Sequence, residues 1–129
     1  MRKRKALVYF SLFVLTGSVG AAQVSVDEDF MQIMDDRQKS LTSNIALGNA
    51  QAASTDIRQI AEMFNDVEAF YAQKGNAQDA VTWSRESKVL AATITKSVAA
   101  KNFDAASQTS VSLAQTCKEC HRAYKKEES

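Results

Sequence analysis

The sequence contains no proline and only four glycines among its 129 residues. A β-sandwich or barrel made of many short strands needs turn residues every ~8 to 12 positions, so the composition nearly excludes an all-β fold. Hydrophobic residues make up 45% of the chain and charged residues 24%. These values are close to the average for folded proteins and unlike those of disordered chains. The length fits a single domain.

The sequence also lacks a hydrophobic run long enough to cross a bilayer. The apolar run at residues 6–15 is about half as long as the ~20 residues that a transmembrane helix needs. It follows four basic residues at positions 2–5 and precedes the small residues at 19–22, the order found in secretory signal peptides. We expect residues 1–22 to be a cleaved export signal, the alternative being an uncleaved anchor. Residues 23–129 then form the mature, periplasmic domain, which has no membrane span.

Basic charge is scarce once the signal is removed. Four of the 16 Lys and Arg residues lie in the signal, whereas all 15 Asp and Glu residues lie outside it. The mature chain therefore has a net charge near −3. Proteins that bind nucleic acid need clustered basic charge to contact phosphates, so we expect no nucleic-acid partner.

Three similar segments divide the mature chain: Gly48–Ala53, Gly75–Ala80 and Lys101–Ala106. Glycine in the first two suits the left-handed residue that ends a helix, and asparagine in all three can cap the next helix. Ser25 and Glu28 match a capping box at the first helix. Short connections make consecutive helices antiparallel. The sequence thus predicts an all-α antiparallel four-helix bundle, with helices over residues 26–47, 50–74, 77–100 and 103–126.

Apolar residues recur at steps of three and four within each segment, as expected for helices that bury one face. The clearest series, in the second segment, is Ala53, Ile57, Ile60, Phe64, Val67 and Tyr71. In the first segment, Arg37 interrupts the series between Met34 and Leu41. A buried arginine without a partner is costly. Either Arg37 reaches the edge of the bundle, or an anionic group lies inside it.

Histidine and cysteine are rare, and all of them lie in one run: Cys117-Lys118-Glu119-Cys120-His121. A Cys-x-x-Cys-His run is the attachment signature of c-type haem. Each thiol adds to one haem vinyl group, and His121 can bind the iron as the proximal ligand. Residues three and four apart share a helix face, so the three side chains can reach one macrocycle. We expect one covalently attached haem c, held by the C-terminal helix.

Three other uses of these cysteines remain open. A structural zinc site needs four ligands, and the chain has no further Cys or His. A thioredoxin-like redox pair is expected beside a βαβ pattern, and no strand pattern is visible. A disulfide between Cys117 and Cys120 would close a very short loop and stabilise little.

The chain resembles the class II c-type cytochromes, which comprise cytochrome c prime and its low-spin, methionine-ligated relatives. The resemblance covers the mature chain and is carried by the haem motif near the C-terminus, by Arg37-Gln38, by Trp83, and by the Ala123–Lys126 segment. It implies a four-helix bundle in which Cys117 and Cys120 form the thioethers. It also implies His121 as proximal ligand and Arg37 as a partner of a haem propionate. Lys125 corresponds to a basic residue near the proximal face, or is simply a solvated lysine.

The resemblance leaves the sixth iron ligand open. Low-spin relatives have methionine four residues after the arginine of the Arg-Gln pair, and this chain has Leu41 there. That match implies five-coordinate iron with an apolar distal face that admits small diatomic gases. Met34, seven residues earlier, is the rival donor, and water or another donor is the third choice. A ligand at Met34 requires the haem to sit differently along the first helix.

The functional prediction is an electron carrier with redox partner proteins. The alternative is a module that binds or senses nitric oxide or carbon monoxide, and a helical interaction protein without haem is the weakest candidate. We expect no enzymatic activity, because the chain has no general base or second histidine to work at a haem. The resemblance also implies a possible homodimer, with which Ile33, Leu47 and Met63 are compatible.

Overall fold

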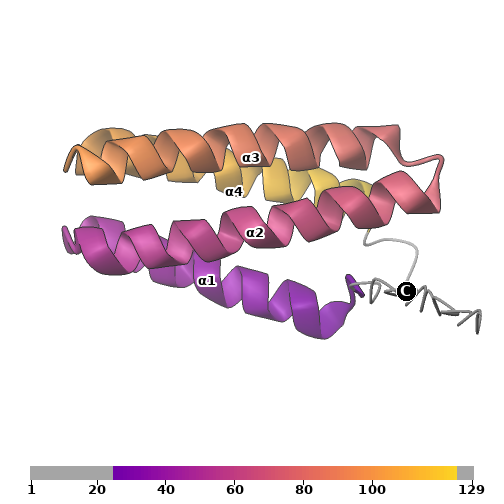
Figure 1. Ribbon diagram of the computed structural model, residues 1–129, viewed down its shortest axis with the longest axis horizontal. Helices are drawn as coiled ribbons and strands as arrows, with labels where there is room; N and C mark the ends of the chain where they lie inside the picture. The colour runs from indigo at the N-terminus through magenta and orange to yellow at the C-terminus, as the bar shows by residue number, and fades with distance from the viewer. Residues whose placement is uncertain (1–24, 125–129) are drawn as a thin grey trace, which may run out of the picture.

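A computed structural model describes residues 25–124 as four helices (Figure 1). They are α1 (Glu28–Ala46), α2 (Ala50–Lys74), α3 (Gln78–Ala99) and α4 (Phe103–Tyr124). Consecutive helices run in opposite directions, and this part of the chain contains no strand. The predicted all-α four-helix bundle is therefore confirmed. The export signal predicted at 1–22 and Lys125 lie outside the described residues.

The helix corners follow the predicted chemistry, with one exception. Gly48 and Gly75 have φ values of 66° and 72°, the left-handed region that glycine adopts without strain. The side chain of Asn49 caps α2 by accepting the N–H of Ala52, and Asn102 accepts the N–H of Ala105 in the same way. The prediction that Asn76 caps α3 is wrong, because the cap residue is Ala77 and it makes no side-chain cap bond.

The predicted capping box at the start of α1 is also wrong. The N-cap is Asp27, whose carboxylate accepts the N–H of Phe30 at 2.9 Å. The helix consequently begins at Glu28, and Ser25 precedes it without capping it. Within the described residues, no helix is both long enough and apolar enough to cross a membrane.

The core lies along the faces predicted from the periodicity. All six residues of the α2 series are buried, from Ala53 to Tyr71. The large side chains that are almost completely buried come from all four helices: Leu41, Ile57, Ile60, Ile94, Val98 and Leu113. Ile33 on α1 and Leu47, which follows its last residue, are exposed, whereas Met63 packs against the core. The homodimer stays a prediction.

Arg37 finds its anionic partner within the protein. Its side chain is 44% exposed, and its Nη1 lies 3.8 Å from Oδ1 of Asp56 on α2. Asp56 is nearly buried, and it accepts hydrogen bonds from Ser40 Oγ at 2.7 Å and from Asn44 Nδ2 at 2.8 Å. Arg37 thus reaches the bundle edge as one alternative expected, and a cluster of four polar residues joins α1 to α2.

One end of the bundle is more open than the other. α1 and α2 separate from each other toward the end where α1 begins (Figure 1). α1 also packs less extensively against α4 than against α2. Near the middle of α1, Gln38 Nε2 donates to Ser110 Oγ at 3.2 Å and links α1 to α4. Beyond this link, the diverging start of α1 leaves space beside the last turns of α4.

Candidate functional site

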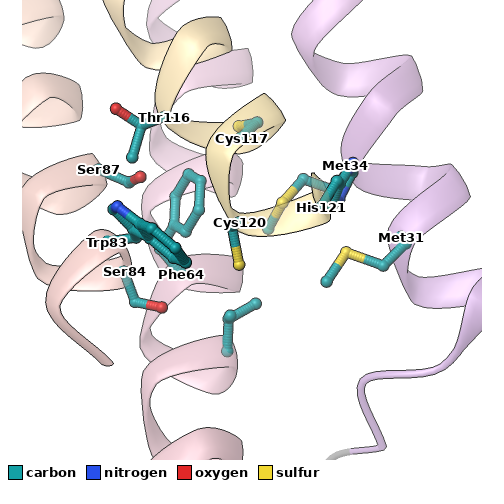
Figure 2. A pocket seen from close by; sticks show the side chains of 11 residues that line it. Met31, Met34, Phe64, Trp83, Ser84, Ser87, Thr116, Cys117, Cys120 and His121 are labelled. Carbon is teal, nitrogen blue, oxygen red and sulfur yellow. The ribbon is translucent and has the colours of Figure 1, made fainter. Parts of the chain in front are cut away.

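A cleft with a cavity volume of about 30 Å³, open to solvent, lies at this end of the bundle, and all four helices line it (Figure 2). Its walls are mostly apolar. α1 contributes the two methionines and α4 contributes the cysteines and the histidine of the sequence motif. The lining residues are Met31, Met34, Phe64, Val67, Trp83, Ser84, Ser87, Thr116, Cys117, Cys120 and His121.

The motif lies in the last two turns of α4. Cys117 and Cys120 are partly buried against the core, whereas His121 is exposed and lines the cleft at its edge. Residues three apart on a helix have Cβ atoms about 5–6 Å apart, and a disulfide requires about 3.5–4.5 Å. This geometry disfavours a Cys117–Cys120 disulfide, and the structure has no disulfide between them.

The surroundings of the thiols favour their protonated form. Burial raises the pKa of Cys117 from its ordinary value of 9.0 to about 11, and the charge of Cys120 in its ionised form and that of Asp35 add to this effect. Burial and then the charge of Asp79 raise the pKa of Cys120 to about 11. As free thiols, both residues are therefore neutral at physiological pH.

The wall opposite the motif is formed by α1. Met31 and Met34 project from α1 toward the end of α4 that carries Cys120 and His121 (Figure 2). Met34 is 8% exposed. The two cysteines, the histidine and Met34 therefore line the same cleft.

Two other predicted site residues lie elsewhere. Leu41 is fully buried in the core and does not line the cleft. It lies two turns from Met34 along α1, about 10 Å at 1.5 Å per residue. Arg37 contacts Asp56 and is likewise absent from the cleft lining. The roles of Leu41 as distal residue and Arg37 as propionate partner stay predictions.

Sequence reasoning missed an aromatic cluster beside the cleft. Trp83, a cleft residue, meets Tyr124 edge-on at a centroid distance of 6.5 Å, and Tyr124 lies 4.9 Å from Tyr71. The Tyr124 hydroxyl donates to the Asp79 carboxylate. These contacts hold the end of α4 against α2 and α3. The sequence gives little indication of this cluster, because no pattern in it pairs Asp79 with Tyr124.

The lining of the cleft is mostly apolar, as the faces of a haem are. The cavity volume of the cleft is only about 30 Å³, far below the ~300–1,000 Å³ typical of small-molecule pockets, so a haem requires the diverging end of α1 to move well outward. Among residues 25–124, no three His, Cys, Asp or Glu side chains converge as a metal site would require, which argues against zinc. The strands of a thioredoxin-like fold are also missing from this part of the chain.

No protein-family model matches this chain, and comparisons with curated proteins and with solved structures give no match. The resemblance to class II c-type cytochromes therefore depends on the motif and the few other residues that carry it. The strongest features of the cleft are the three motif side chains on α4 and the two methionines facing them.

Proposed function

We propose that this chain is an exported c-type cytochrome that carries single electrons through one haem held in the cleft. One observation supports the proposal above all others: Cys117, Cys120 and His121 line a single, mostly apolar cleft. Bound haem supplies an iron that alternates between two oxidation states. The thiols of Cys117 and Cys120 would form thioethers to its vinyl groups, and His121 would offer a ring nitrogen on the proximal side.

The methionines on α1 favour the electron carrier over the gas-binding module. When the iron already has its sixth ligand, its coordination changes little as it gains or loses an electron, so the reorganisation energy of electron transfer is small. Met34 was the rival donor in the sequence analysis, behind five-coordinate iron, and it lines the cleft on the α1 side. The gas-binding alternative relied on Leu41 covering the iron, and Leu41 packs in the core instead. We therefore propose Met34 as the distal ligand and no enzymatic activity.

Haem attachment is tested on protein exported by a host that attaches c-type haem. Denatured wild-type protein should keep its haem through acid extraction, because thioether bonds survive it. The double variant Cys117→Ala/Cys120→Ala should lose the haem. Wild-type protein from which haem washes out would end the c-type proposal.

Ligation is tested by the absorption spectrum of the reduced protein with and without carbon monoxide. With Met34 on the iron, the wild type is low-spin and resists carbon monoxide, and Met34→Leu becomes high-spin and binds it. Met63→Leu is the matched control, since Met63 packs against the core without lining the cleft. A high-spin wild type whose carbon monoxide binding accelerates in Leu41→Ala would instead support the gas-binding module.

A further inference from the structure

The wall of the cleft formed by α3 and α4 is held together by contacts that do not involve α1. α3 packs more extensively against α4 than α1 does, so the outward movement of α1 that a haem requires leaves these contacts in place. Two of them lie beside the motif. Trp83 on α3 lines the cleft and meets Tyr124 on α4 edge-on, and the Tyr124 hydroxyl donates to Asp79 in the first turn of α3.

These contacts place the Asp79 carboxylate close to the haem motif. Tyr124 follows Cys120 by four residues, so the two side chains share one face of α4, and the tyrosine hydroxyl reaches Asp79. Burial raises the pKa of the Cys120 thiol, and the negative charge of Asp79 raises it further. Asp79 therefore acts electrostatically on the atom through which the proposed haem would be attached.

The carboxylate of Asp79 is fixed in position and is not neutralised by an ion pair with Lys or Arg. Its Oδ1 also accepts the N–H of Ala80 at 2.9 Å, which ties it to the start of α3. No Lys or Arg side chain of residues 25–124 forms an ion pair with it, and Arg122, on the same stretch of α4 as the motif, pairs with Glu119 instead. A negative charge therefore stands beside the end of α4 that carries the motif.

We propose that Asp79, positioned by Tyr124, is a fixed negative charge that lowers the reduction potential of the haem. The inference rests on the proposed function, because it requires a haem attached at Cys120. Reduction adds the electron of a redox partner to the haem, and a nearby negative charge opposes this addition. Because Asp79 is exposed, its effect passes through solvent and weakens as the salt concentration rises.

The test compares the reduction potentials of exported, haem-loaded proteins, measured by spectroelectrochemical titration at low salt. Asp79→Asn removes the charge and keeps the shape of the side chain. We expect this variant to favour the reduced state at least about twofold, a rise of about 18 mV at 59 mV per tenfold change. Asp104→Asn is the matched control and should leave the potential unchanged. Asp104 is also an exposed aspartate in the first turn of a helix, but α4 begins at the opposite end of the bundle (Figure 1).

Salt and a second variant separate the effect of the charge from that of the hydrogen bond. The difference in potential between wild type and Asp79→Asn should fall by at least half when the Debye length falls from about 30 Å at 0.01 M to about 3 Å at 1 M ionic strength. Tyr124→Phe keeps the charge of Asp79, which the N–H of Ala80 still holds, so it should shift the potential by less than half as much. A difference that salt does not change, or an equal shift in Tyr124→Phe, would mean that Asp79 acts through structure and would overturn the proposal.

A further variant covers the case in which Asp79→Asn does not fold. Gln78→Lys introduces a positive charge at the exposed residue before Asp79, and it should raise the potential with the same dependence on salt. An unchanged potential in either variant would overturn this inference and leave the proposed function standing. A wild type without covalently attached haem would end both, and acid extraction shows this before any potential is measured.

Discussion

The thiols of Cys117 and Cys120 lie against apolar side chains, and this burial raises the pKa of each to about 11. The thiolate is the reactive form, so a pKa two units above the ordinary 9.0 predicts slow alkylation of the haem-free chain. At pH 8, we expect iodoacetamide to react about 100-fold more slowly with the folded chain than with the chain unfolded in urea. Mass spectrometry over time measures both rates. Equal rates would mean that the thiols are not buried.

The hydroxyl of Tyr124 offers a second test at the residue scale. The hydrogen bond to Asp79, followed by burial, raises the pKa of Tyr124 from 10.0 to about 12. A raised pKa means that the folded state favours the neutral phenol. The resulting stabilisation is complete below pH 10 and is lost as the pH rises from 10 to 12. Asp79→Asn should therefore lower the pKa of Tyr124 toward 10.

Phenolate absorbance measures this titration. In a haem-free chain that begins at residue 23 and carries Tyr71→Phe, Tyr124 is the single remaining tyrosine. The same titration of this background with Asp79 intact is the control. If the two curves coincide, the Tyr124–Asp79 hydrogen bond does not form in solution.

Among the contacts between helices, the cluster around Asp56 joins α1 to α2. Asp56→Ala leaves the partly buried donors of Ser40 and Asn44 without their acceptor. An unsatisfied buried donor costs about 1–3 kcal/mol, so we expect a loss of this size in the free energy of unfolding, measured with urea. Asp66→Ala, at a less buried position of α2, should change it by less than ~0.5 kcal/mol. Similar losses for the two variants would argue against the cluster.

The helices themselves were largely predictable, because glycine and asparagine mark corners and the apolar spacing marks the buried face. The start of α1 was not. Ser25 and Asp27 are both good caps, and the choice depends on packing that the sequence does not display. With Asp27 as N-cap, Val26 and Met31 occupy the two positions of a hydrophobic staple, and both pack against the core. If Ser25 were the N-cap, Val26 and Met31 would no longer occupy the two positions of the staple.

Over the whole molecule, the candidate site could be predicted on α4 but not on α1. Spacing alone brings Cys117, Cys120 and His121 to one face of a helix. Which residues of α1 lie beside these three side chains depends on the axial offset and the crossing angle between α1 and α4. The spacing of apolar residues within one helix determines neither of these. Leu41 and Met34 both lie on the inward face of α1, yet only Met34 lines the cleft. The ion pair between Arg37 and Asp56 could not be predicted either, because it too depends on how α1 and α2 are positioned relative to each other.

The divergence of α1 from its neighbours has a consequence for local unfolding. Backbone amides that few packed side chains cover open at low free energy and exchange their hydrogens quickly. In the haem-free chain, amides in residues 31–37 should exchange at least about tenfold faster than those around Ile57, which is fully buried on α2. A haem that fills the cleft would slow this exchange, so the start of α1 is the segment whose order depends most on what the protein holds. Equal protection along both helices would show that this end of the bundle is closed without a bound group.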